Sequence, residues 1–406
     1  MKSKFATRRR HTLLTGLALV LAACGGGGGP TEPAPEPLIT IGGVADGQTY
    51  PGPVTITVSI DRGTYEITLN GEAILSGRTV SDPGAYTLIV TARNGGTTAT
   101  RQVAFTIAAP AGGVLLVRML NLGPNEMGGG GDAILVTDSS GTGLRHALVD
   151  AGPAGASASD PGYVARRLGA LGVDTLAFML LTHAHSDHFQ GMTDVLNQVK
   201  VRQFYYNGSR RSLSFYQNLL TLAGQRADTV IVLTDTAGVQ LGGSRFTLVP
   251  PLPTYLNQTN ASSDEENEGS LGALLRRATF EMFFTGDGEY EANARWRTQF
   301  ATLTRNVDVL KVGHHGANNA IFDSGSGGAS TWLEHTNPSI SVISSNGVTH
   351  PRLAAIDRLL SRTNMRTYCT SVHGEITIRV LSTGSHAVTV ERNANANCVR
   401  GTQATT

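Results

Sequence analysis

The stretch TLAFMLLTHAHSDH, residues 175–188, is an apolar run followed at once by three histidines and an aspartate. The apolar run predicts a continuously buried β-strand. His183 and His185 are separated by one residue, so an extended backbone directs both imidazoles to the same side. Asp187 and His188 enter the following turn and point to a second centre close by. Imidazole and carboxylate are ligands that zinc and similar divalent ions prefer, so this stretch predicts a metal site at the end of a strand.

Three further apolar runs end in side chains that bind metals or carry protons. Asp287 follows one run within a Gly-Asp-Gly turn, where the glycines let the backbone turn tightly. His314 and His315 follow the next run, and His350 follows the last. Paired metal ions in hydrolases lie about 3.5–4 Å apart and need a shared anionic ligand. The repeated order of strand and then polar residue therefore predicts that distant segments converge on a two-metal site.

The chain has 406 residues, of which 40% are hydrophobic and 16% are charged. This composition fits a globular protein of two or three domains and excludes a coiled coil, a polytopic membrane protein and a collagen-like rod. The formal net charge is +1, but residues 1–23 hold five basic side chains and no acidic one. Without them the charge falls to about −4, which disfavours dedicated nucleic-acid binding.

Residues 1–23 are typical of an export signal, with a basic start and an apolar run too short to span a bilayer comfortably. The run ends in Leu-Ala-Ala-Cys24, which resembles the lipobox of bacterial lipoproteins, where the cysteine is lipid-modified. An ordinary cleaved signal with an incidental cysteine is the alternative. Residues 24–37, rich in Gly and Pro, fit a tether. We therefore expect an exported protein that is lipid-anchored through Cys24 to the bacterial cell envelope, at the outer membrane or cell surface.

Residues 38–108 contain short runs of alternating polar and apolar side chains separated by turn residues. This pattern predicts a small all-β sandwich, similar to the immunoglobulin-like modules of bacterial surface proteins. It carries no catalytic constellation, so we expect a spacer or an adhesion module, with contact to a surface polymer as one possibility. The remaining cysteines, Cys369 and Cys398, are an even pair whose disulfide would pin the C-terminal tail, although the sequence leaves their pairing open.

The region from residue 114 to about 380 resembles the metallo-β-lactamase fold, and within it the hydrolase-like domain of ComEC-type DNA-uptake proteins. It is also similar to the phosphorylcholine esterases of the same layout. The matching motifs, in order, are GGGDAILV, LVDAG, LTHAHSDHFQGM, NEGSLGALL, FTGDGE, VLKVGHHG, ISSNGVTHP and YCTSVHGEITI. The resemblance implies an α/β domain over residues 114–385, an αββα sandwich with metals at one edge, followed by a tail over residues 386–406.

By motif, the resemblance implies a role for each candidate side chain. His183 and His185 would hold the first metal, Asp187 and His188 the second, Asp287 would bridge them, and His314 or His315 would complete the second site. Asp150 would orient a ligand by a hydrogen bond, Asn267 and Ser270 would lie near the site, Asp187 or Asp287 would steer a water molecule, and His350 would contact substrate or donate a proton. Two divalent ions are implied, with zinc as the first choice and manganese or iron as alternatives.

One departure concerns the first metal. Many members of the wider superfamily supply another histidine here, but this chain has none between His188 and His314. The first metal would then have three protein ligands, His183, His185 and Asp287, with water or substrate filling its shell. ComEC-type members share this shortfall.

The implied reaction is hydrolysis of a phosphoester or phosphodiester by a metal-bound hydroxide. We expect a small anionic ester as substrate, since the acidic run at residues 264–268 would repel a polyanion such as DNA, unless that run is only a solvated surface loop. Two alternatives stay open. The chain is either a hydrolase of another ester or a lactam, or a non-catalytic surface-binding lipoprotein with a degenerate metal fold.

Overall fold

The computed structural model describes residues 34–80, 84–108, 112–122, 130–141, 143–154, 162–256 and 262–403. The expected signal peptide and the lipidation site Cys24 lie outside the described residues, as does most of the tether. No helix within these ranges combines the length and the apolar character that crossing a bilayer requires.

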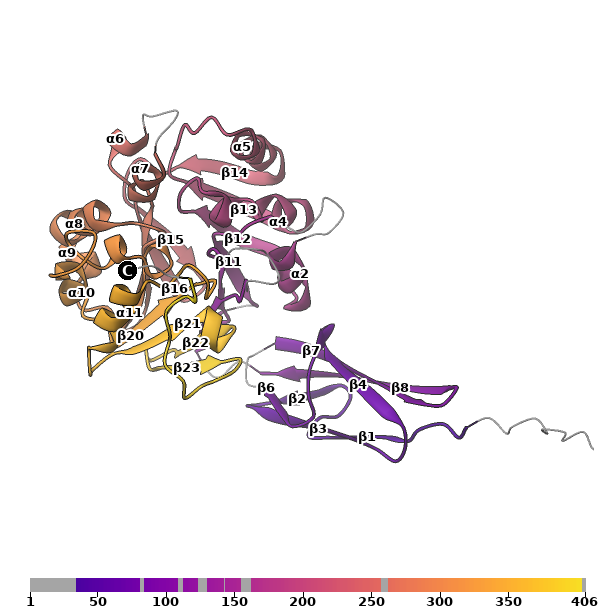
Figure 1. The fold of residues 1–406 in the computed structure, drawn as a ribbon. Coiled ribbons are helices and arrows are strands. Elements are labelled where there is room, and N and C mark those ends of the chain that lie inside the picture. The colour runs from indigo at the N-terminus through magenta and orange to yellow at the C-terminus, as the bar shows by residue number, and fades with distance from the viewer. Residues whose placement is uncertain are drawn as a thin grey trace, which may run out of the picture.

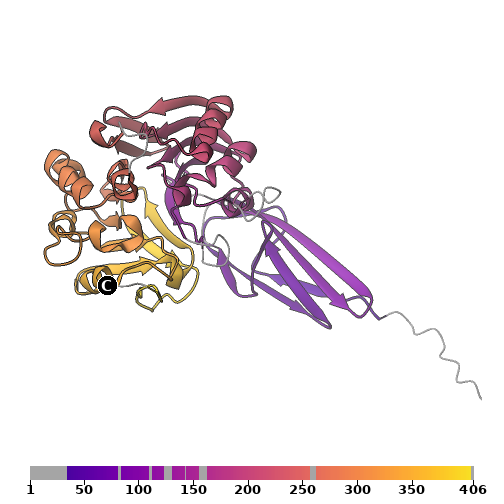
Figure 2. The ribbon, with the colours of Figure 1, turned by 45° about the horizontal axis from the view of Figure 1, so that its top comes forward.

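The N-terminal unit is a sandwich of two small sheets, β1-β3-β6 and β2-β8-β7-β4-β5. Its strands are β1 (Ile39–Gly42), β2 (Gln48–Tyr50), β3 (Val54–Ile60), β4 (Thr64–Leu69), β5 (Glu72–Ala73), β6 (Arg78–Val80), β7 (Gly84–Asn94) and β8 (Thr97–Ile107). Strand β3 alternates buried and exposed residues, so its apolar side chains join those of the facing sheet in one core. Figure 2 shows this sandwich beside the larger unit. The small all-β domain predicted from the sequence is confirmed.

The larger unit contains two mixed sheets. The eight-stranded sheet has the order β14-β13-β12-β11-β10-β9-β22-β23. Its strands are β9 (Val114–Met119), β10 (Ile134–Asp138), β11 (Arg145–Val149), β12 (Thr175–Leu181), β13 (Lys200–Tyr206), β14 (Ala227–Val232), β22 (Ile376–Leu381) and β23 (His386–Val390). The seven-stranded sheet follows the chain from β15 to β21. Its strands are β15 (Ala237–Leu241), β16 (Ser244–Val249), β17 (Gly272–Arg277), β18 (Phe280–Phe284), β19 (Val309–Lys311), β20 (Ile340–Ile343) and β21 (Arg366–Cys369).

Helices cover the outer faces of both sheets (Figure 1). The first sheet is followed along the chain by α2 (Tyr163–Ala170), α3 (Ser186–Phe189), α4 (Met192–Gln198) and α5 (Ser214–Arg226). The second half holds α6 (Pro253–Leu256), α7 (Ser263–Glu268), α8 (Tyr290–Gln299), α9 (Ala301–Thr304), η1 (His314–Gly316), η2 (Asn318–Ala320), α10 (Thr331–Thr336), α11 (Leu353–Leu360) and α12 (Thr370–His373).

Three apolar cores define the layers. One core consists of side chains from the strands of both sheets and lies between them. A second joins the first sheet to α2, α4 and α5, and a third joins the second sheet to α8, α10 and α11. Strand β12 has apolar neighbours on both faces of the first sheet, so it is continuously apolar as predicted, whereas the edge strands β14 and β23 are mostly exposed or half-buried. The αββα sandwich expected from the sequence is confirmed.

The C-terminal boundary differs from the expected one. Residues 386–390, which the sequence analysis placed in a tail, form β23 and pair antiparallel with β22 at the edge of the first sheet. The pair is a hairpin, so a boundary at residue 385 cuts between two strands that share a ladder. Cys369 at the end of β21 forms a disulfide with Cys398, which attaches the rest of the tail to the second sheet.

Candidate metal centre

The predicted ligands meet at one edge of the sandwich. Strands β11 and β12 are parallel, as are β18, β19 and β20, so their carboxyl ends lie at the same edge of their sheets. The Asp287 carboxylate oxygen Oδ2 lies 3.1 Å from His188 Nε2, 3.3 Å from His315 Nε2 and 3.9 Å from His183 Nε2. His315 Nε2 also lies 3.3 Å from Asp187 Oδ2. Segments more than 100 residues apart thus bring nitrogen and oxygen donors into one buried cluster.

Hydrogen bonds behind the cluster fix how His188 and His183 present their nitrogens. His188 Nδ1 donates to Asp150 Oδ2 over 2.8 Å, which leaves the lone pair on Nε2. The Thr182 hydroxyl donates to the same carboxylate over 2.7 Å, so its oxygen is free to accept from His183 Nδ1 at 3.1 Å. His183 Nε2 then also carries a lone pair. Asp150 therefore orients two imidazoles at once, which is how protein groups behind a metal set the tautomer of its ligands.

The structure separates the two histidines of the His314/His315 pair. His315 Nδ1 lies 2.9 Å from the Ser344 carbonyl oxygen, to which it donates, so Nε2 carries the lone pair that faces Asp187 and Asp287. The backbone is left-handed at both residues, with φ of 42° at His314 and 53° at His315. His314 faces a different partner, the buried carboxylate of Glu289, at 2.8 Å from its Nδ1. His315 is thus the member of the pair that can serve as a ligand.

The donor set fits divalent cations. Four buried atoms of the cluster have no hydrogen-bond partner among the described residues: Asp132 Oδ1, His188 Nε2, Asp287 Oδ1 and His315 Nε2. Buried polar atoms are rarely left unpaired unless an ion or a water satisfies them. Donors about 2.0–2.2 Å from a tetrahedral cation lie roughly 3.4 Å apart, close to the separations in the cluster. The side chains therefore fit a metal centre better than a hydrogen-bonded network.

Groups of three ligating side chains with all donor atoms within 4.8 Å of one another recur in the cluster. They are His183/His188/Asp287, Asp187/His188/His315, Asp132/Asp287/His315 and Asp132/Asp150/His188. His185 belongs to none of these groups among the described residues, and its Nδ1 lies 2.9 Å from His183 Nε2. The donors expected for the second metal thus meet closely, and His185 lies beside the first centre in contact with His183.

Two side chains of the cluster were missed by the sequence analysis. Asp132 precedes β10 within the quoted GGGDAILV motif, and Lys311 ends β19; both are almost fully buried and they form an ion pair. Lys311 Nζ also donates to the Gly286 carbonyl oxygen over 2.7 Å and lies 3.7 Å from Asp287 Oδ1. A lysine inside an otherwise apolar strand was the available signal, because a buried cation needs a carboxylate partner.

Burial and neighbouring charges set the protonation states. Burial lowers the pKa of His183 well below its ordinary value and that of His185 to about 4, so both are neutral near pH 7, as metal ligands must be. Burial opposes charge on His188 and His315, but the neighbouring carboxylates outweigh it. They raise the pKa of His188 well above its ordinary value and that of His315 to about 10, so without metal both rings are cations. Burial alone would raise the pKa of Asp287, but these two cations hold that pKa well below its ordinary value, and a bound metal would take the place of their Nε2 protons. Asp287 is therefore an anion suited to bridging two cations.

The predicted polar pair supports the site from behind. Ser270 Oγ accepts a hydrogen bond from the backbone nitrogen of Asp287 over 3.1 Å. Asn267 Nδ2 donates to Glu289 over 2.8 Å and thereby holds the carboxylate that faces His314. His350 lies on the open side, with its ring centre 5.4 Å from that of His314. Burial, aided by His315 and His314, lowers the pKa of His350 to about 3.

The acidic run at residues 264–268 is not the solvated loop that the sequence analysis considered. It forms α7, with a capping box between Ser262 and Glu265. Glu266 is buried and accepts hydrogen bonds from the Ala184 backbone nitrogen and the Ser209 hydroxyl. Glu268 is also buried and accepts from the first backbone nitrogens of α8. Two of the acidic side chains thus serve structure, and the run carries less exposed charge than its composition suggested.

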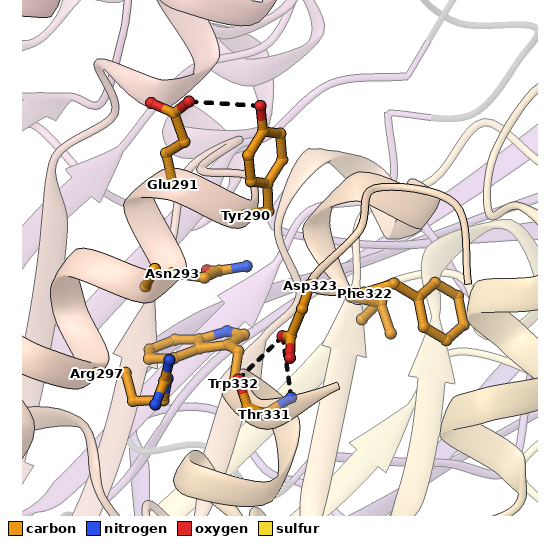
Figure 3. Close-up of a pocket in the computed structure, with 10 residues that line it drawn as sticks. Tyr290, Glu291, Asn293, Arg297, Phe322, Asp323, Thr331 and Trp332 are labelled. Atoms are coloured by element: carbon orange, nitrogen blue, oxygen red, sulfur yellow. Dashed lines mark hydrogen bonds between the residues drawn. The ribbon is translucent and has the colours of Figure 1, made fainter. Parts of the chain in front are cut away.

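A cavity of about 230 Å³ lies apart from the cluster, against α8 and α10 (Figure 3). Its lining includes Tyr290, Asn293, Arg297, Asp323 and Trp332. None of the site residues predicted from the sequence lines it. We therefore locate the candidate site by its side-chain chemistry rather than by the size of a cavity.

No protein-family model matches the chain, and no curated protein matches it. Among solved structures, the chain is similar to a variant of the CmlA β-hydroxylase, with a TM-score of 0.41, 15% identity, and coverage of 66% of this chain and 54% of that chain. It is also similar to a diphosphatase of the PhnP family, with a TM-score of 0.38, 12% identity, and coverage of 66% and 98%. A third similar structure is a B3 metallo-β-lactamase, with a TM-score of 0.31, 14% identity, and coverage of 51% of this chain and 85% of that chain.

This chain spans about half the length of CmlA. The architecture is an αββα sandwich of two mixed sheets, preceded by a small β-sandwich. All three TM-scores lie below 0.5, so we argue the chemistry of the site from its own side chains.

Proposed function

We propose that this chain is a dinuclear metal-dependent hydrolase of a small anionic ester, a phosphoester or phosphodiester, exported and lipid-anchored at Cys24. The observation that carries the proposal is that three histidine nitrogens point at one buried carboxylate. His183, His188 and His315 donate their Nδ1 protons away from the centre and direct Nε2 toward the Asp287 carboxylate. Export and anchoring rest on the N-terminal sequence alone.

The ligand assignment follows from the contacts. His183 with Asp287, and His185 beside it, would hold one cation; Asp187, His188 and His315 with Asp287 would hold the other. Two bound divalent cations lower the pKa of a shared water and neutralise charge that develops on an ester oxygen. Asp187 is partly exposed, so its carboxylate can also accept a hydrogen bond from a water entering the site. Asp150 and Ser344 keep the imidazoles in the required tautomer.

The open side of the centre offers a proton donor. His314 Nδ1 contacts the buried carboxylate of Glu289, which fixes the orientation of the ring. His350 stands opposite, and its lowered pKa makes it a neutral hydrogen-bonding group near pH 7. We therefore assign protonation of the leaving oxygen to His314, and substrate contact to His350.

The charge of the loaded centre favours an anionic substrate. Bound cations are the largest local charges in such a site and dominate over the slightly acidic surface. A phosphate ester on an envelope polymer or a lipid headgroup has the matching charge and is reachable from an anchored enzyme. A β-lactam or another ester is the second class to be tried.

The test combines metal analysis with a substrate panel. The purified protein is assayed for bound metal and for hydrolysis of bis-p-nitrophenyl phosphate, p-nitrophenyl phosphate, a chromogenic β-lactam and single-stranded DNA. Asp287→Asn should abolish turnover, because it removes the shared anionic ligand. Asp228→Asn is the matched control, since Asp228 is an exposed carboxylate paired with Lys200 on the edge of the first sheet.

We expect about two metal ions per chain and hydrolysis of a phosphate ester. Hydrolysis of only the β-lactam would show that the substrate is a lactam and not a phosphate ester, while the metal-dependent mechanism would still hold. Metal binding without turnover of any probe would favour a binding protein, and removal of the metal without any change in activity would contradict the proposal.

A further inference from the structure

The end of the chain lies against the loop that carries His350. Three backbone nitrogens of the tail donate to three carbonyl oxygens of that loop. The bonds run from Gly401 to Pro351 over 2.9 Å, from Thr402 to Gly347 over 2.9 Å and from Gln403 to Val348 over 2.6 Å. Residues 401–403 thus hydrogen-bond to the backbone of the loop at three positions.

The contact is close enough to require glycine at residue 401. A Cβ atom there would lie 2.5 Å from the Val348 carbonyl oxygen and 2.9 Å from the His350 backbone nitrogen. These are backbone atoms that cannot swing away, so any side chain would displace the loop. Gly401 is also buried. The tail and the loop therefore fit each other through their backbones.

The tail is tied to the second sheet just before this contact. The disulfide between Cys398 and Cys369 anchors it to the end of β21, and both cysteines are fully buried. His373 Nε2 lies 3.1 Å from the Ala396 carbonyl oxygen and must donate to it, while Arg366 donates to the same oxygen over 2.6 Å. The three residues that meet the loop follow directly from this anchor.

Other hydrogen bonds hold the two ends of the loop: the Ser345 backbone nitrogen donates to Thr370 Oγ1 and the Arg352 backbone nitrogen donates to the Gly316 carbonyl oxygen, each over 2.9 Å. Asn346 Oδ1 accepts from the backbone nitrogens of Val348 and Thr349, which closes the turn from within. The loop carries His350, whose ring centre lies 5.4 Å from that of His314 and 6.1 Å from that of His315. The tail supplies the hydrogen bonds to the carbonyl oxygens of Gly347, Val348 and Pro351.

We infer that the disulfide-tethered segment 398–403 is a positioning element of the substrate-binding face, which holds the His350 loop in place beside the centre. Its effect on catalysis rests on the proposed function, whereas its effect on the loop does not. Because the anchor is a disulfide, reduction should release the tail and loosen the loop, so that substrate binding depends on the oxidised state of Cys369 and Cys398.

The test uses the full-length, metal-loaded protein and removes the contact in two ways. A stop codon at position 401 deletes the three hydrogen bonds and keeps the disulfide. The variant Gly401→Val keeps the chain length and inserts a side chain where none fits. Thr402→Ala is the matched control, because its side chain is exposed and its backbone hydrogen bond remains. The wild type treated with a reductant that does not bind metal gives the third arm.

Three quantities are measured: amide hydrogen exchange in residues 346–352, bound metal, and KM and kcat for the phosphate ester. We expect exchange in the loop and KM each to rise about tenfold in the truncated and Gly401→Val proteins, because misplacing a substrate-contacting group weakens binding. Exchange in residues 176–181 of β12 and the metal content should stay unchanged, which separates loosening of the loop from unfolding.

Unchanged exchange in the loop of the truncated protein would overturn the inference, whatever happens to hydrolysis. Faster exchange with an unchanged KM would overturn the assignment of the loop to the substrate-binding face. Absence of hydrolysis by the wild type would overturn the proposed function instead, and the exchange measurement would then decide the role of the tail by itself.

Discussion

Asp150→Asn should weaken metal binding by reversing the tautomer of His188, at a modest cost to the stability of the fold. The Asp150 carboxylate accepts from the Thr182 backbone nitrogen, from the Thr182 hydroxyl and from His188 Nδ1, over 2.7–2.8 Å. Asparagine has the same shape and tolerates the left-handed backbone at this position, where φ is 54°. Its oxygen can keep the bond from the Thr182 nitrogen. Its NH2 group then faces His188 Nδ1 and donates instead of accepting.

The change reverses the tautomer of His188. With Nδ1 forced to accept, the proton moves to Nε2, which is the atom that must carry a lone pair toward Asp287. Loss of such a partner behind a ligand costs about 10–100-fold in metal affinity, or roughly 1.4–2.8 kcal/mol. The stability of the metal-free protein should fall by about 1–2 kcal/mol, because the hydrogen bonds from the Thr182 hydroxyl and from His188 Nδ1 both end on the oxygen that becomes NH2.

The assay is a competitive chelator titration with zinc, run beside urea unfolding of the metal-free protein. Asp138→Asn is the control, because Asp138 is an equally buried carboxylate whose partners, Arg277 and Ser244, lie away from the centre. It should lose stability and keep the metal affinity of the wild type. Equal metal affinities for Asp150→Asn and the wild type would refute the tautomer argument.

Three further perturbations follow from the contacts. Glu289→Gln keeps the shape of the group that faces His314 but removes its charge, so kcat should fall about 100-fold with metal content unchanged, as measured by steady-state kinetics and metal analysis. Lys311→Met leaves the Asp132 carboxylate buried without its cation, so urea unfolding of the metal-free protein should show a loss of about 3–5 kcal/mol; a loss under 1 kcal/mol would mean that the pair is dispensable. Burial lowers the pKa of His146 to about 4. In the unfolded chain His146 has a pKa near 6.5, so lowering the pH protonates the unfolded state before the folded state. The free energy of unfolding should therefore fall by about 2 kcal/mol between pH 7.5 and pH 5. His146→Gln should remove that part of the slope in chemical denaturation with a chelator present, and identical slopes for both proteins would contradict it.

The candidate ligands that directly follow a buried apolar strand could be predicted from the sequence. Each buried apolar strand is followed at once by its ligand, so residues 175–188 and the Gly-Asp-Gly turn at Asp287 pointed to one sheet edge. The Cys369–Cys398 disulfide was left open because the sequence gives no distance between the two, and the structure pairs them.

Other features depend on contacts that spacing does not encode. Both histidines of the pair have a left-handed backbone, and it is their partners, the Ser344 carbonyl for His315 and the Glu289 carboxylate for His314, that show which one enters the cluster. Asp132 precedes its strand rather than following it, so the rule that found the other ligands passed over it. Glu289 follows the bridging aspartate by two residues and looks like a surface acid until its buried contact with His314 is seen.

X-ray diffraction from crystals grown with zinc, with anomalous data collected at the metal edge, tests the central claim most directly. We predict two anomalous peaks about 3.5–4 Å apart, with the Asp287 carboxylate between them and the Nε2 atoms of His188 and His315 about 2.0–2.1 Å from one of them. A map with no peak within reach of Asp287, or with zinc bound only by surface side chains, would contradict the account.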